Sequence, residues 1–155
     1  MRDSYLVFRD TLRVIDASWS RLSRDIRTGT GALLLSRNRA VRTACLSSLR
    51  RIDVTRQNLL GVPMANRAPQ RVRTELEKRL TELRPALTRC ETEFEQFSDP
   101  AKSTGVRDVG ATSVPNALAA SRKFELAAEA FLSSLGIKVR PFASGDSNPF
   151  AGRAN

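Results

Sequence analysis

The sequence predicts an all-α protein, an antiparallel four-helix bundle with a long loop between its third and fourth helices and an irregular C-terminal tail. Four segments repeat apolar residues at alternating spacings of three and four, the period of a helix with one buried face. Strand signals are weak, and a length of 155 residues suits one domain. Each apolar face must be buried against the other helices. We assign residues 1–136 to the bundle and residues 137–155 to a C-terminal extension.

The first helix is expected over residues 4–27, where the pattern is clearest. Its apolar stripe consists of Tyr5, Phe8, Leu12, Ile15, Trp19, Leu22 and Ile26. The glycine-containing sequence Thr28-Gly-Thr-Gly31 breaks the pattern and ends this helix.

A second helix is expected to begin between residues 33 and 37 and to run to Leu60, with Gly61 as its stop. Its buried stripe consists of Val41, Cys45, Leu49 and Ile52. Residues 61–69 contain two prolines, which do not continue a helix, so this segment is expected to be a loop.

The third helix is expected over residues 71–97, although Pro85 removes one backbone donor and should kink or split it. Its apolar stripe consists of Leu76, Leu80, Leu83, Leu87, Cys90, Phe94 and Phe97. The same segment carries the acids Glu75, Glu77, Glu82, Glu91, Glu93 and Glu95. These carboxylates can meet arginines of a neighbouring helix or of a neighbouring subunit.

Residues 98–115 form the expected long connection, since helix connections in bundles usually span about 2–8 residues. The fourth helix is expected to open at Pro115, a favourable first-turn residue, and to end at Gly136. Its stripe of small and aromatic residues consists of Ala117, Ser121, Phe124, Ala128, Phe131 and Leu135. The tail that follows is rich in Gly, Pro, Ser and Asn.

Several chemistries are excluded by composition. The chain has no His, which removes Ser-His-Asp and Cys-His catalysis, a His general base and His-bearing zinc sites. Cys45 and Cys90 lack CxxC spacing and are expected to be small buried side chains, with a disulfide as the alternative. No Walker-type phosphate loop is present. We expect no enzyme, metal site or cofactor, and without an apolar run of membrane-spanning length we expect no membrane partner.

The basic charge is concentrated in the first half of the chain. Residues 1–73 hold 15 Arg and 5 Asp, whereas residues 74–155 hold 7 Arg and 4 Lys against 11 acids. This asymmetry favours a surface that faces a polyanion, most simply nucleic acid, with acidic proteins and anionic membranes as alternatives. Arg39, Arg42 and Arg50 fall within an arc of about 80° of the second helix, where they can grip successive phosphates.

Five short segments resemble, in order, the coat proteins of rod-shaped RNA viruses of the tobamovirus and tobravirus kind. They are Ala17-Ser-Trp19, Val41-Arg42-Thr43, Thr88-Arg89, Val106-Arg107-Asp108-Val109 and the stretch from Phe131 to Val139, which contains Gly-Ile-Lys-Val. These coats are four-helix bundles of similar length that pack around RNA, with an irregular loop between the third and fourth helices. The chain departs from them in having no Arg-Phe-Pro before the third helix and in its net charge of +10.

The resemblance implies RNA contacts by Arg42, Arg89 and Arg107, with Asp108 as a hydrogen-bond partner of ribose. It also implies a function: a structural coat subunit that binds single-stranded RNA without sequence preference and self-assembles into a helical polymer or ring. Such a protein is located in the virion and, if viral, in the host cytoplasm. The alternative is a helical adaptor or accessory subunit of a larger protein or ribonucleoprotein complex.

Two observations favour self-assembly independently of the resemblance. Six apolar residues outside the expected helices need a partner: Val109, Val114, Ile137, Val139, Phe142 and Phe150. A basic half and a half rich in Glu also allow the Glu face of one subunit to meet the Arg face of the next. Because the net charge of +10 opposes association, we expect RNA and higher salt to promote it.

Overall fold

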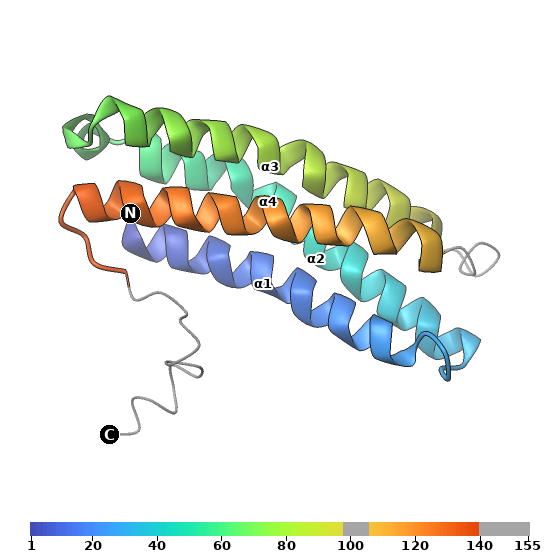
Figure 1. Ribbon diagram of the computed structural model, residues 1–155. Helices are drawn as coiled ribbons and strands as arrows, with labels where there is room; N and C mark the ends of the chain where they lie inside the picture. The colour runs from blue at the N-terminus through green and yellow to red at the C-terminus, as the bar shows by residue number, and fades with distance from the viewer. Residues whose placement is uncertain (98–105, 140–155) are drawn as a thin grey trace, which may run out of the picture.

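A computed structural model describes residues 1–97 and 106–139, and of residues 106–111 only the backbone. The described chain is all-helical, without strands (Figure 1). Its α-helices are α1 (Arg2–Asp25), α2 (Gly31–Leu60), α3 (Gln70–Phe97) and α4 (Val106–Ser134), and a short 3-10 helix, η1 (Pro63–Arg67), lies between α2 and α3. The predicted fold class is thus confirmed.

Successive helices run antiparallel, and the N-terminus of α1 lies at the same end of the bundle as the C-terminus of α4 (Figure 1). α2 packs against α1 and α3, and α4 packs mainly against α3. The smaller contact between α1 and α4 closes the bundle. α2 and α4 therefore occupy opposite corners, so that the outer faces of these two helices point away from each other.

Most residues of the predicted stripes form the core, whereas Trp19, Ile26, Leu49 and Leu135 are partly buried at its margin. All seven stripe residues of α3 are buried, so this face of the helix points into the bundle. The fully buried large side chains include Tyr5, Phe8, Phe94, Phe124 and Phe131. The Phe124 ring lies edge-on to Phe8, with centroids 5.2 Å apart, and Trp19 lies edge-on to Phe94 at the margin of the core. Each fully buried aromatic or leucine side chain stabilises the fold by roughly 1.5–3 kcal/mol relative to its exposure.

Backbone signals in the sequence define two helix ends. Thr30 is the N-cap of α2, and its side-chain oxygen accepts a hydrogen bond from the Leu33 amide. α2 therefore begins at Gly31, slightly earlier than predicted. Gly136 has φ 76°, and its amide and that of Ile137 bond the Ser133 and Leu132 carbonyls, which is a Schellman motif. The predicted stop at Gly136 is confirmed.

The prediction that Pro115 opens the fourth helix is wrong, and Pro85 does not split the third helix. α4 begins at Val106, and Pro115 lies inside it. Val114, directly before this proline, is fully buried, and burial of its apolar side chain favours the helical turn despite the lost backbone bond. α3 likewise runs unbroken past Pro85. Pro85 has no N–H to bond the backbone carbonyl one turn earlier in the helix, but because Pro85 is exposed, water can reach that carbonyl. Of the predicted connection, residues 98–105 lie outside the described part of the chain.

Three of the apolar residues expected to need a neighbouring subunit are packed in their own bundle. Val114 is fully buried, and Ile137 and Val139 pack against the core. The side chain of Val109 lies outside the described part of the chain, as do Phe142 and Phe150. The prediction of self-assembly therefore loses the support of these three residues.

Candidate nucleic-acid interface

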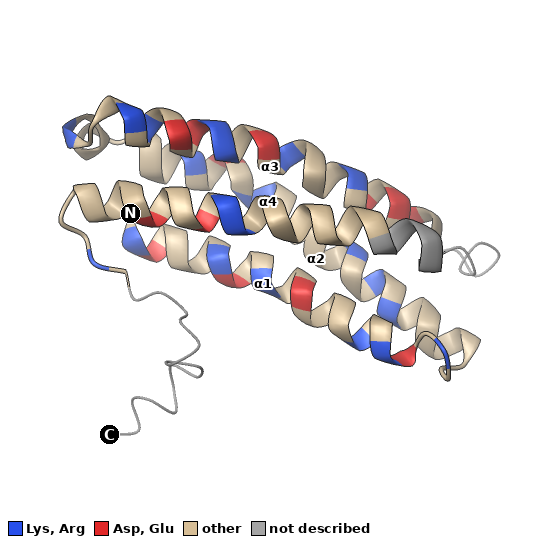
Figure 2. Cartoon of the chain, in the orientation of Figure 1, with Lys and Arg blue, Asp and Glu red and all other residues tan. Residues whose placement is uncertain are grey.

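The charge asymmetry of the sequence becomes an asymmetry between helices. α2 carries six arginines and one aspartate, whereas α3 carries equal numbers of basic and acidic residues (Figure 2). Ion pairs join the two helices, and their partners are Arg42 with Glu91, Arg56 with Glu77, and Arg84 with Asp53. Glutamates of α3 thus meet arginines of a neighbouring helix, as the sequence predicts, but they neutralise only part of the charge of α2.

Arg39 and Arg50, two of the predicted RNA-binding residues, are exposed on α2. Within the described part of the chain neither has a carboxylate at ion-pair distance, and the same holds for Arg51 beside them. On α1, Arg21 and Arg24 are also exposed without such a partner among the described residues. We take these five arginines together as the candidate interface and call them the α1–α2 arginine face; helical spacing places Arg50 on the side of α2 that carries Arg39.

The other predicted RNA-binding residues have different surroundings. Arg42 donates from Nε to Glu91, 3.0 Å away, so its guanidinium is held against α3. Arg89 is exposed and pairs loosely with Glu93 one turn along α3, at 3.5 Å. Arg107 and Asp108 lie in the first turn of α4, where side chains are not described. The structure therefore does not bring the six predicted residues together on one surface.

A groove runs between α1 and α2 along the outside of the bundle and has a volume of about 800 Å³. Val7 and Val14 of α1 form one wall, and small residues of α2 form the other: Ala40, Thr43, Ala44 and Ser47. Arg21 and Arg39 both line it, which brings arginines of two helices to one site. Sequence reasoning missed Arg21 because the spacing within one helix does not reveal which residues of the next helix lie beside it.

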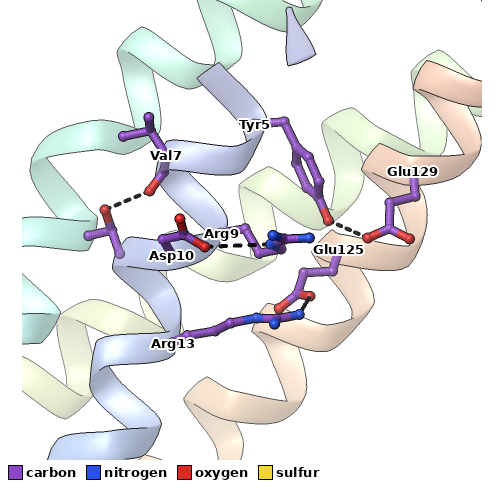
Figure 3. Close-up of polar contacts among 8 residues, drawn as sticks. Tyr5, Val7, Arg9, Asp10, Arg13, Glu125 and Glu129 are labelled. Carbon is purple, nitrogen blue, oxygen red and sulfur yellow. Dashed lines mark hydrogen bonds and ion pairs between the residues drawn. The ribbon is translucent and has the colours of Figure 1, made fainter. Parts of the chain in front are cut away.

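Polar side chains join α1 to α4 along the opposite side of α1 (Figure 3). Tyr5 donates its hydroxyl hydrogen to Glu129, 2.5 Å away, and Arg13 donates to Glu125 at 2.8 Å. Arg9 is buried between them and lies 5.9 Å from the centre of the Tyr5 ring. Burial, followed by the hydrogen bond to Glu129, raises the pKa of Tyr5 above its ordinary range. This network therefore joins α1 to α4.

Cys45 on α2 and Cys90 on α3 are both free and buried, as predicted, and their sulfur atoms are 3.3 Å apart. The hydrogen bond that the Cys45 thiol donates to Cys90, together with burial, raises the pKa of Cys45. Because both side chains are fully buried, the pair belongs to the core.

The described residues contain no group of three or more His, Cys, Asp or Glu side chains arranged to hold a metal ion. Nor does any helix in that part of the chain combine the length and apolarity needed to cross a membrane. No protein-family model, curated protein or solved structure matches the chain.

Proposed function

We propose that this protein is a structural subunit, and no enzyme, that binds single-stranded RNA through its α1–α2 arginine face and assembles on it as a coat protein does. The observation that carries the proposal is the exposure of Arg39 and Arg50 without acidic partners among the described residues. The glutamates of α3, by contrast, are largely engaged within the bundle. In this proposal the protein resides in the virion, and in the host cytoplasm before assembly.

The chemistry of the face favours phosphate contacts over base recognition. A guanidinium offers a planar fork of donors that matches a phosphate group. Base recognition in single strands relies on exposed aromatic rings, and no aromatic side chain of the described residues is exposed. Binding through phosphates alone is independent of sequence. A coat that covers a whole RNA needs this property.

The proposal is tested by the salt dependence of RNA binding. Affinities of the protein for two short single-stranded RNAs of unrelated sequence are measured by fluorescence anisotropy over a range of salt concentrations. We expect equal affinities that fall steeply with salt. The double variant Arg39→Gln/Arg50→Gln should bind both RNAs more weakly, and the slope of log affinity against log salt should fall by about 1.4, because each phosphate contact contributes about 0.7.

A matched control removes the same charge from α3. Arg79 and Arg84 are paired with carboxylates of Glu75, Glu82 and Asp53, so Arg79→Gln/Arg84→Gln should change the slope much less. Binding that is absent, insensitive to salt, or weakened equally by both double variants contradicts the proposal.

A second candidate function, a helical adaptor, is favoured by the groove between α1 and α2. Val7 and Val14 are 44% and 51% exposed and both line this groove, so a partner that fills it would bury two apolar side chains at one site. In this case the groove and the arginine face bind another protein, and the chain does not polymerise. Sedimentation with and without RNA separates the two functions, because a strictly monomeric particle in every condition favours the adaptor.

A further inference from the structure

Two exposed apolar features lie on different faces of the bundle. One is the α1–α2 groove with Val7 and Val14. The other is Leu126 on α4, which at 71% is the most exposed large apolar side chain of the described residues. Phe124 and Ala128, two residues before and after Leu126, are both buried. Because side chains two residues apart on a helix point to nearly opposite sides, the side chain of Leu126 points away from the core.

The two features cannot meet within one molecule. The groove lies on the outside of α1 and α2, and α4 lies at the corner opposite α2 (Figure 1). Contact between Leu126 and the groove therefore requires a second copy of the chain. When Leu126 of one copy contacts the groove of another, each copy uses a different face, which is a head-to-tail contact.

We propose that the outer face of α4 of one subunit docks in the α1–α2 groove of the next, with Leu126 packed against Val14. Ala119 and Ala130 flank Leu126 on the same exposed face, and a helix with such small residues can approach closely. The wall formed by α2 is also built from small residues, which leaves the groove open to a helix.

One pair of charges on the two surfaces is complementary, although Arg21 and Arg39 also line the groove. Asp10 is the acid that lines the groove, and it lies one turn before Val14 on α1. Arg122 lies one turn before Leu126 on α4, is exposed, and has no ion-pair partner among the described residues. With α4 parallel to α1 and Leu126 level with Val14, Arg122 lies level with Asp10. The occupant of the groove is thus a second copy of this chain.

The contact gives the assembly of the proposed coat a specific geometry, and in that sense it rests on the proposed function. Each subunit uses its groove for one neighbour and its α4 face for another, so the contact repeats into a ring or a helix. Arg21 and Arg39 line the groove and are covered by this contact, whereas Arg50 and Arg51 do not line it and remain available to RNA in the assembled state. Pairing of subunits and binding of RNA can therefore be measured separately.

The test uses two full-length variants, Leu126→Asp, which disables the α4 face, and Val14→Asp, which disables the groove. Sedimentation velocity is measured at raised salt, which screens repulsion between the basic subunits. We expect the wild type to associate as its concentration rises and each variant alone to remain monomeric. An equimolar mixture of the variants should form a 1:1 heterodimer and nothing larger, because each member keeps one intact surface.

Val54→Asp is the matched control, because Val54 is 49% exposed on α2 and does not line the groove. It should associate like the wild type. A second pair tests the charges: Asp10→Arg should weaken association, and a mixture with Arg122→Asp should restore pairing. Circular dichroism checks that each variant is folded, as expected for substitutions at exposed positions.

Three results overturn the proposal: a wild type that stays monomeric, association of Leu126→Asp or Val14→Asp alone, or a mixture of the two that does not pair. The first is expected if another protein or the chain's own residues 140–155 occupy the groove. Affinity for a short RNA that binds one subunit is measured in parallel, with Val54→Asp as the charge-matched reference. Pairing without RNA binding refutes the proposed function alone, and RNA binding without pairing refutes this contact alone.

Discussion

Arg42 of α2 and Glu91 of α3 are joined by a hydrogen bond of 3.0 Å, although the sequence places Arg42 on the same side of its helix as Arg39 and Arg50. The side chain of Glu91 is largely buried, whereas Arg39 and Arg50 are exposed. Three arginines that are equivalent by helical spacing thus have different surroundings, and this difference has measurable consequences.

We predict that Arg42→Ala lowers the free energy of unfolding by about 1–2 kcal/mol, because it leaves the Glu91 carboxylate without its donor in a largely buried position. Arg50→Ala should change it by less than about 0.5 kcal/mol, since Arg50 is exposed. RNA affinity should show the reverse order, with the larger loss in Arg50→Ala. Urea unfolding and RNA titration of both variants check this, and equal effects on stability would contradict it.

The stripes of the helices could be predicted because a period of 3.6 residues fixes which side chains share a face. α3 is the best example, since each of its predicted core residues is buried. The start of α4 could not be predicted, because the rule that proline opens a helix is local. Burial of Val114 against the rest of the bundle decides the outcome, and this contact is distant in sequence.

The candidate interface was predictable only in part, for a related reason. Helical spacing places Arg39 and Arg42 on the same side of α2, but the ion pair of Arg42 depends on the position of α3. The groove that unites Arg21 with Arg39 depends in the same way on how α1 packs beside α2. Such pairings follow from the packing of whole helices, and one sequence does not specify them.

The buried pair of thiols gives a second prediction. Cys45 and Cys90 are the two cysteines of the chain, and neither is exposed. Alkylation by a maleimide should therefore require unfolding, and it should be slower by at least about a thousandfold than alkylation of an exposed thiol, given the usual stability of a domain. Thr92→Cys, at an exposed position of α3, supplies the exposed thiol as a control. Rapid labelling of Cys45 or Cys90 in native conditions would show that this part of the core opens readily.

Two glycines should respond in opposite directions to the same substitution. Gly136 has φ 76°, so Gly136→Ala should lower the free energy of unfolding by about 1–2 kcal/mol through backbone strain alone, because a Cβ there meets no atom. Gly31 starts α2 in the ordinary helical region with open space around it, so Gly31→Ala should raise the stability by up to about 1 kcal/mol. Thermal unfolding of both variants measures the difference, and the same sign for both would be the contrary result.

The last prediction concerns pH and rests on the hydrogen bond between Tyr5 and Glu129. Burial and the Glu129 carboxylate raise the pKa of Tyr5, so the native state holds the phenolic proton more tightly than the unfolded chain, in which the pKa is about 10. Between pH 10 and the raised native pKa, the native state binds more protons. The contribution of Tyr5 is therefore fully present below pH 10 and is lost progressively as the pH rises above it.

Tyr5 is the single tyrosine of the chain, so the near-ultraviolet absorbance of phenolate reports on this residue alone. We expect phenolate to appear only together with loss of the helical circular dichroism signal. Tyr5→Phe should cost about 1 kcal/mol at neutral pH, because Glu129 loses its donor, and it should flatten the decline of stability above pH 10. The lysines also titrate in this range, but they are the same in Tyr5→Phe and in the wild type. A difference between the two stability curves above pH 10 therefore comes from Tyr5. Phenolate that forms near pH 10 in a chain that remains helical would mean that Tyr5 is in contact with water and that α1 and α4 are not joined at this residue.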